Sequence, residues 1–371
     1  MTERHSEILV IGGGVIGLSI AWHLSRSGHS ITVFDSSEPG QASKAAAGML
    51  APLAEASAPG PFLDLALASL RRYPGFIERL KTASGLDLEI CGPGILRVAR
   101  TFDEEAALDR ALEWQAALGL PLDRLSGEEV RRLEPAAAQS IIAAIRSPHE
   151  CQIEPRLLLA ALSSACCSQG VQQISGKVTG LESQAERVIA VRMETDHFSC
   201  STLVIAGGAW SEMVGEWLGV NIPVRPLRGQ ILALGPCEIP ILQHTLYTHG
   251  AYLVPRRDGR IVAGATEESV GLDTSPTVCG IAALRSGAEA LIPALADLPL
   301  HSAWTGLRPL SGDVLPLMGR APGWDNVHIA TGHGRNGILL APVTGSLMAD
   351  AILKGMPLPA AFDPARFGGK P

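Results

Sequence analysis

The stretch Ile8–Gly17, ILVIGGGVIG, constrains the fold of this chain more than any other. Its first four residues are apolar and predict a short, buried parallel strand. The strand leads directly into Gly12, Gly14 and Gly17, which have the G-x-G-x-x-G spacing of a turn that binds a dinucleotide pyrophosphate. In that interpretation Gly12 permits the tight turn, Gly14 lets the backbone approach the phosphates, and Gly17 lets the next helix pack closely.

The residues that follow supply the context that this motif needs. Ile16, Ile20 and Leu24 recur at helical spacing and predict a helix with one apolar face. A second apolar run, Ile31–Phe34, ends at Asp35, close to the distance of about 20 residues at which a carboxylate bonds the ribose hydroxyls. A chance glycine run in an ordinary strand–helix–strand unit is the alternative. The motif alone does not separate FAD from NAD(P).

Composition and charge exclude several classes of protein. The 371 residues are 46% hydrophobic and 18% charged, which is typical of a globular chain with room for two domains. The net charge of −7 argues against broad nucleic-acid binding and against an anionic membrane surface. The apolar start is shorter than the roughly 20 residues that span a bilayer, and acidic Glu3 and Glu7 precede it. We therefore expect no signal peptide and no membrane span.

The seven cysteines are scattered and form no C-x-x-C pair. No Cys/His spacing typical of a metal site occurs, so no metal is expected. An odd number of cysteines, two of them adjacent at Cys166 and Cys167, indicates reduced thiols and a cytoplasmic protein.

Hydrophobic patterns predict the other elements of the chain. Small residues fill Ala45–Pro52, AAAGMLAP, and either let a flat group lie against the backbone or begin a helix. Three closely spaced runs, Val171–Ile174, Lys177–Glu182 and Arg187–Glu194, predict an antiparallel meander. A further strand is expected over Tyr247–Val254. Helices are expected over Leu63–Leu80, Asp103–Leu118, Arg156–Gln169, Thr277–Ile292 and Gly337–Lys354.

Two later strands end in glycines. Thr202–Ile205 leads to Gly207 and Gly208, and Val327–Thr331 leads to the segment 332–334, Gly-His-Gly. A chain that returns to the nucleotide in this way is what a flavin domain requires, whereas a single NAD-binding unit does not. These features favour FAD, and they predict nucleotide-binding pieces at the start, middle and end of the chain.

Six motifs together resemble the D-amino-acid oxidase family of flavoproteins over nearly the whole chain: GGGVIG, ASKAAAGMLAP, AGGAWS, AYLVPRRDGRIVAGAT, GLRP and GHGRNGILLAP. The resemblance implies an α/β fold in which a Rossmann-like FAD-binding domain of the GR2 type is interleaved with an antiparallel-sheet α+β substrate domain. It places the FAD-binding domain at 1–82, 150–222 and 300–371, and the substrate-binding domain at 83–149 and 223–299. It also implies a homo-oligomer, a tetramer in the family.

The motifs and the resemblance together give a set of expected FAD contacts. FAD is expected to be held non-covalently, because no cysteine follows Cys279 and no histidine lies in Ser36–Pro52, the two places where relatives attach it. The expected contacts are Gly12, Gly14, Val15, Ile16, Gly17, Asp35, Ser36, Ala42, Ser43, Ala47, Gly48, Met49, Val178, Gly207, His333, Gly334, Arg335, Asn336, Gly337, Ile338 and Leu339.

Three residues match the substrate site of the resembled family. Arg308 resembles the arginine that holds the substrate carboxylate, and its planar fork suits both oxygens. Tyr252 resembles a tyrosine whose hydroxyl also reaches the carboxylate, and Arg335 matches a further arginine beside the substrate or the flavin edge. The alternatives are a surface arginine for Arg308 and a strand-packing aromatic for Tyr252. Glu267 departs from the family, which commonly has an apolar residue there.

The resemblance implies oxidation of glycine and small amines such as sarcosine and small D-amino acids. The Cα hydride passes to flavin N5, and O2 then takes the electrons to give H2O2, with the imine hydrolysing to glyoxylate and ammonia or serving thiamine thiazole synthesis. No catalytic side chain beyond the flavin is required. A sarcosine oxidase or a D-amino-acid oxidase or dehydrogenase is the alternative within the family, and an NAD(P)-binding regulatory module is the alternative from another class.

Overall fold

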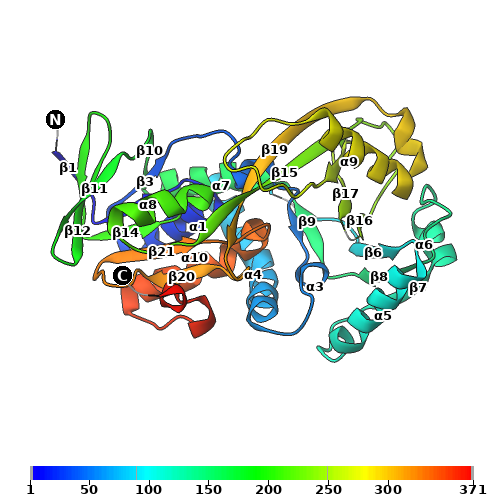
Figure 1. Ribbon diagram of the computed structural model, residues 1–371, viewed down its shortest axis with the longest axis horizontal. Coiled ribbons are helices and arrows are strands. Elements are labelled where there is room, and N and C mark those ends of the chain that lie inside the picture. The colour runs from blue at the N-terminus through cyan, green and yellow to red at the C-terminus, as the bar shows by residue number, and fades with distance from the viewer. Residues whose placement is uncertain (1–2, 89, 249, 369–371) are drawn as a thin grey trace.

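The computed structural model describes residues 3–88, 90–248 and 250–368. The molecule is elongated, with the N- and C-terminal ends of the chain in one half and strands β6, β7 and β8 in the other (Figure 1). Each half is built on one large sheet, six-stranded in the half with the chain ends and eight-stranded in the other. The predicted α/β architecture is confirmed.

The six-stranded sheet has the order β10-β3-β2-β14-β21-β20. Its central strands are parallel and almost wholly buried, as their continuous apolar sequences predict, and β20 is an antiparallel edge. The predicted nucleotide-binding strands are confirmed. The strands are β2 (Ile8–Ile11), β3 (Ile31–Asp35), β10 (Gln172–Ser175), β14 (Thr202–Ile205), β20 (Leu317–Arg320) and β21 (Val327–Thr331).

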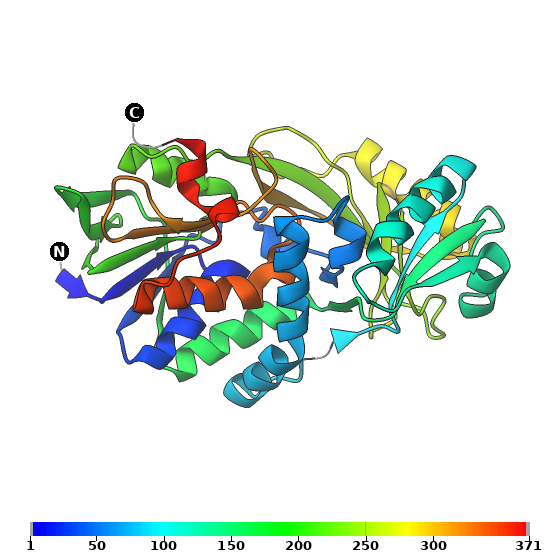
Figure 2. The ribbon, with the colours of Figure 1, turned by 90° about the horizontal axis from the view of Figure 1, so that it is seen from below.

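Side chains alternate between the two faces of this sheet. Ile8 and Val10 point into a core shared with four helices, which Figure 2 shows gathered on one side of the sheet: α1 (Val15–Leu24), α4 (Pro61–Ser84), α7 (Pro155–Ser168) and α10 (Gly337–Lys354). Leu9 and Ile11 point into a second core. That core is closed by α8 (Ser211–Leu218) and a small sheet of β1 (Glu3–His5), β11 (Gly180–Gln184), β12 (Arg187–Arg192) and β13 (His197–Ser199).

The expected three-stranded meander is wrong at its first strand. Strand β10 pairs in parallel with β3, with Gln172 opposite Thr32, and so extends the six-stranded sheet. Helix α7 precedes it and returns the chain to the edge of that sheet, which short spacing in the sequence does not reveal. Only β11 and β12 form the expected antiparallel pair, to which β13 is added.

The eight-stranded sheet has the order β19-β15-β18-β17-β16-β6-β8-β7 and is antiparallel except where β16 joins β6. The run expected as one strand over Tyr247–Val254 is a hairpin of two strands. The strands are β6 (Ile95–Ala99), β7 (Asp123–Ser126), β8 (Ala143–Ser147), β15 (Val224–Leu234), β16 (Thr245–Thr248), β17 (Ala251–Pro255), β18 (Ile261–Gly264) and β19 (Leu300–Ser311). Its helices are α5 (Phe102–Ala116), α6 (Gly127–Leu133) and α9 (Val278–Leu291).

Strands β15 and β19 join the two halves. They pair along their whole length, and Figure 1 shows them running from one half into the other. The division into two domains stays a proposal, but this pairing moves one of its boundaries. A domain boundary at residue 300 would place β19 in a different domain from β15, the strand with which it pairs. We therefore place the start of the last nucleotide-binding segment at 312. Residues 369–371 of that segment lie outside the described residues.

Among the described residues, one helix, α10, is long and apolar enough to cross a membrane. Its mean hydropathy is 1.4, yet 56% of it is buried inside the protein. Helix α10 lies against α1 and α4, where Ile338, Leu340 and Met348 contribute to the core. Its apolar sequence is accounted for by this packing.

Candidate active site between the two sheets

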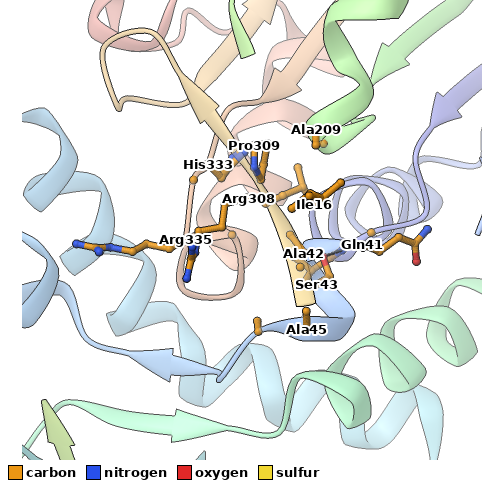
Figure 3. A pocket seen from close by; sticks show the side chains of 18 of the residues that line it. Ile16, Gln41, Ala42, Ser43, Ala45, Ala209, Arg308, Pro309, His333 and Arg335 are labelled. Atoms are coloured by element: carbon orange, nitrogen blue, oxygen red, sulfur yellow. Dashed lines mark hydrogen bonds between the residues drawn. The ribbon is translucent and has the colours of Figure 1, made fainter. Parts of the chain in front are cut away.

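A cavity of about 690 Å³ lies where the two halves meet. On the nucleotide side it is lined by the β2–α1 turn, the segment after β3, the end of β14 and the loop between β21 and α10. On the other side it is lined by residues of β16, β17 and β19. Both Arg308 and Arg335 line it. Figure 3 shows that they come from different elements and that the small side chains of Ala42, Ser43 and Ala45 lie beside Arg308.

The glycine turn is packed so closely that no side chain fits at Gly12 or Gly17. Gly12 has φ +112°, and a Cβ there would lie 2.2 Å from the carbonyl oxygen of Ala206. A Cβ on Gly17 would lie 1.9 Å from the carbonyl oxygen of Gly12, so the predicted close packing of helix on strand is present. Gly17 does not line the cavity. Gly14, by contrast, lines it beside the first turn of α1, whose N–H groups and positive dipole end suit a phosphate.

Asp35 lies at the end of β3, where a ribose carboxylate was expected. Its Oδ1 accepts hydrogen bonds from Ser37 N–H at 2.7 Å and from Gln41 Nε2 at 2.6 Å. Its Oδ2 faces Gly13, where a Cβ would lie only 2.6 Å away. Gln41 and Gly13 were not predicted from the sequence. They fix the carboxylate on the cavity wall through contacts that only the folded chain creates.

Ser43 connects the next segment to the glycine turn. Its Oγ accepts a hydrogen bond from Val15 N–H at 3.1 Å, which caps α1 from outside the helix. Ser43 belongs to the short helix α2 (Ala42–Ala45). Ser43 thus orients the helix terminus that faces the cavity.

The small-residue segment after α2 is extended rather than helical. Ala46 has φ −60° and ψ 150°, and the chain continues into β4 (Met49–Leu50). A Cβ on Gly48 would lie 1.9 Å from the carbonyl oxygen of Ile153, a residue of β9 (Cys151–Ile153), with which β4 pairs. The sequence left open whether this segment begins a helix or lets a flat group lie against its backbone. The helix start is wrong.

Two side chains from the other half hold this extended segment in place. Arg256 Nη2 donates to the carbonyl oxygen of Ala47 at 2.7 Å, and Trp304 Nε1 donates to that of Ala45 at 3.0 Å. The sequence analysis assigned neither residue this role. They fix the distance between the two walls of the cavity.

The loop before α10 brings the last predicted cofactor contacts to the cavity. His333 is buried, and its Nε2 lies 3.1 Å from Thr344 Oγ1. Burial lowers the pKa of His333 to about 3, so its ring is neutral at ordinary pH. Asn336 occupies the N-cap position of α10 without a side-chain capping hydrogen bond, and Gly337 and Ile338 at the start of this helix line the cavity.

The other residues that were expected to contact FAD can be compared with the lining of the cavity. Leu339 is 1% exposed in the core and, like Gly17, does not line the cavity. Every other residue expected to contact FAD does line it, including Ser36, Val178, Gly207 and Gly334.

Arg308 and Tyr252 lie together on the opposite wall. Arg308 Nη1 donates to the carbonyl oxygen of Thr266 at 2.9 Å, and its guanidinium packs over Gly229, where a Cβ would lie 2.5 Å from it. Tyr252 packs over Gly264 in the same way. Burial raises the pKa of Tyr252 to about 12, and the nearby charge of Arg308 opposes that shift. The tyrosine therefore stays a neutral hydroxyl beside a cation.

Arg335 is shared between two carboxylates. Its Nε forms an ion pair with Glu55, and its Nη1 lies 3.1 Å from Glu267 Oε1. Glu55 belongs to α3 (Pro52–Glu55), and burial raises its pKa while Arg335 opposes that rise. Glu55 was missed, although a lone acid directly after the small and apolar run 45–54 could have indicated it. Tyr247, which lines the cavity opposite Tyr252 in the hairpin, was also missed.

The residues present fit a flavin dinucleotide. The tight glycine turn, the fixed carboxylate of Asp35 and the end of α1 all line the cavity and suit a ribose and pyrophosphate. The cavity then continues past the N-terminus of α10 to Arg308, which leaves a polar wall for a small anionic substrate. Fold and site together define a dinucleotide-dependent oxidoreductase.

Comparison with known proteins makes the assignment more specific. Residues 7–351 match the family described as FAD dependent oxidoreductase, and the chain belongs to this family. FAD is its cofactor. The chain is 38% identical to the bifunctional protein ThiO/ThiG of Synechocystis sp., covering 98% of this chain but only 54% of that protein. It is 37% identical to glycine oxidase of Bacillus licheniformis, covering 95% and 94% of the two chains.

The crystal structure of glycine oxidase from Geobacillus kaustophilus has the same fold. It superposes with a TM-score of 0.92 at 31% identity, covering 99% of both chains. The interleaved arrangement expected from the sequence is thereby confirmed.

Proposed function

We propose that this protein is an FAD-dependent oxidase of glycine and small amines such as sarcosine and small D-amino acids. The observation that carries the proposal is the position of Arg308. It faces the cavity beside Tyr252, and within residues 3–88, 90–248 and 250–368 no carboxylate forms an ion pair with it. A half-buried guanidinium whose side-chain hydrogen bond goes to a carbonyl oxygen is ready to bind a substrate carboxylate.

The chain's own residues bind and orient the substrate. Arg308 would hold both carboxylate oxygens, and the neutral hydroxyl of Tyr252 would donate to one of them. FAD, when bound, accepts the hydride that leaves the substrate Cα. The N-terminus of α10 would stabilise negative charge that develops at that end of the cavity. No side chain of this chain needs to form a covalent bond to the substrate.

The names of the similar proteins also support the proposed oxidation of glycine. Full-length relatives near 35% identity are glycine oxidases, and three longer relatives are bifunctional ThiO/ThiG proteins. We propose by the same likeness that the imine product serves thiamine thiazole synthesis. A cytoplasmic location and a homo-oligomer, a tetramer by the resemblance, are further proposals, which fractionation and light scattering would test.

A peroxide assay with a panel of substrates tests the proposed function. The purified holoprotein is mixed with glycine, sarcosine, D-alanine, D-proline and the L forms of the last two under air. We expect peroxide from glycine and sarcosine and from the small D forms, with little from the L forms. Flavin-loaded protein that releases no peroxide with any of these amines would refute the oxidase assignment.

A further inference from the structure

Four charged side chains face the cavity at its substrate end. Two are the cations Arg308 and Arg335, and two are the anions Glu55 and Glu267. The adjacent residues Thr266 and Glu267 each contact one of the arginines, but with different groups. The carbonyl oxygen of Thr266 accepts from Arg308, whereas the carboxylate of Glu267 pairs with Arg335.

The two arginines therefore differ in how far neighbouring carboxylates neutralise their positive charge. Arg308 has a carbonyl partner and keeps its full positive charge for an anion. Arg335 has two carboxylate partners, so the group of three carries a net negative charge. A ligand with one carboxylate satisfies Arg308, whereas a second carboxylate would meet a cation that is already paired twice.

The two carboxylates differ in exposure to solvent. The side chain of Glu55 is 5% exposed, that of Arg335 is 47% exposed and that of Glu267 is 54% exposed. Glu55 is therefore the inner partner, and Glu267 is the outer partner on the solvent side. An ion pair as exposed as Arg335–Glu267 contributes little to stability, so Glu267 can be changed without unfolding the chain.

Building on the proposed function, we infer that Glu267 restricts the enzyme to amines with a single anionic group. Its carboxylate repels a second negative charge on the substrate and occupies the face of Arg335 that would bind it. A small substituent without charge, such as the N-methyl group of sarcosine, meets no such penalty. Removal of the charge at 267 exposes Arg335 to the ligand.

The substrate pair that tests this differs by one carboxylate. Sarcosine carries an N-methyl group, and iminodiacetate carries an N-carboxymethyl group on the same amine. We expect Glu267→Gln to raise the ratio of kcat/KM for iminodiacetate to that for sarcosine by about tenfold, the size expected for one partly screened charge contact. Glu128→Gln is the matched control. It removes an exposed carboxylate that pairs with Arg132 on α6, far from the cavity residues, and should leave the ratio unchanged.

A binding measurement separates this inference from the proposed function. Acetate, malonate and succinate are titrated into the holoprotein, and changes in the flavin absorbance give each Kd without turnover. Glu267→Gln should tighten at least one dicarboxylate about tenfold relative to acetate. Equal relative affinities in the wild type and in Glu267→Gln would overturn the inference, even if amines are oxidised. Absence of turnover combined with the expected change in Kd would instead refute the proposed function alone.

Discussion

At the scale of the residue, Asp35 and Arg308 are held by contacts that point their charges into the cavity. Asp35 is fixed through one oxygen by Ser37 and Gln41, and Arg308 is fixed through one nitrogen by Thr266. In each case part of the charged group remains directed at the cavity. Each charge can therefore be tested by a substitution that leaves its neighbours in place.

Replacing the carboxylate of Asp35 should weaken FAD retention. Asp35→Ala removes charge-assisted hydrogen bonds to the ribose, which should raise the Kd of FAD by about tenfold or more. Flavin content after dialysis, measured by absorbance, reports the loss, and circular dichroism shows that the fold survives. Asp297→Ala, at an exposed position outside the cavity, is the control. Full flavin retention in Asp35→Ala would show that the ribose assignment is wrong.

Replacing Arg308 by lysine should impair substrate binding but not flavin binding. Losing one arm of a bidentate contact costs about 2 kcal/mol, so KM for glycine should rise about thirtyfold. Steady-state kinetics and flavin content are measured together. Arg225→Lys, exposed on the neighbouring strand β15, should change neither. An unchanged KM in Arg308→Lys would remove Arg308 from the substrate site.

At the scale of the element, the short helix α3 carries Glu55 and is held by a buried polar group. Glu150 Oε1 accepts hydrogen bonds from Leu53 N–H at 2.5 Å and Ala54 N–H at 3.3 Å. Arg97 and Gln115 donate to the carbonyl oxygen of Leu53 at 3.2 Å and 3.0 Å. A helix of four residues is not stable through its own hydrogen bonds. These contacts with Glu150, Arg97 and Gln115 therefore fix the position of α3.

Glu150 should make stability depend on pH. Burial raises its pKa from 4.5 to about 7, so the folded state keeps its proton where the unfolded state has lost it. The stabilisation is complete below pH 4.5 and is lost as pH rises toward about 7, by an amount on the order of 3 kcal/mol. Glu150→Gln keeps the accepting oxygen and should flatten this dependence.

Thermal unfolding midpoints at about pH 5 and about pH 8 measure this effect. We expect the difference between the two midpoints to shrink in Glu150→Gln and to stay as in the wild type in Glu128→Gln. A difference that is the same in all three proteins would mean that Glu150 does not titrate in this range.

Helices and strands were predicted well where a local sequence pattern determines them. They were predicted poorly where the pairing of distant strands determines them. The glycine turn, β2, β3 and α10 follow from apolar runs and helical spacing, which act within a few residues. Strand β10 was assigned to the wrong sheet because its partner β3 lies more than 130 residues earlier. Similarly, Arg256 acquires its role only when distant segments meet, because its partner Ala47 lies 209 residues earlier in the chain.

At the scale of the whole molecule, the FAD site is assembled from three separate stretches of the chain. No stretch supplies an attachment point, because Trp304–Gly337 contains no cysteine and Ser36–Pro52 contains no histidine. We therefore predict that FAD is held by non-covalent contacts alone. Acid precipitation followed by centrifugation should leave the yellow colour in the supernatant, and a yellow pellet would contradict this prediction.

The central claim is that the bound flavin takes electrons directly from a small amine held at Arg308. The most direct measurement is to mix the holoprotein with glycine in the absence of oxygen and to follow the visible absorbance of the flavin. We predict that the absorbance is lost with glycine and sarcosine, more slowly at the same glycine concentration in Arg308→Lys, and that it returns when air is admitted. An absorbance unchanged by glycine, sarcosine and the small D-amino acids would contradict the account.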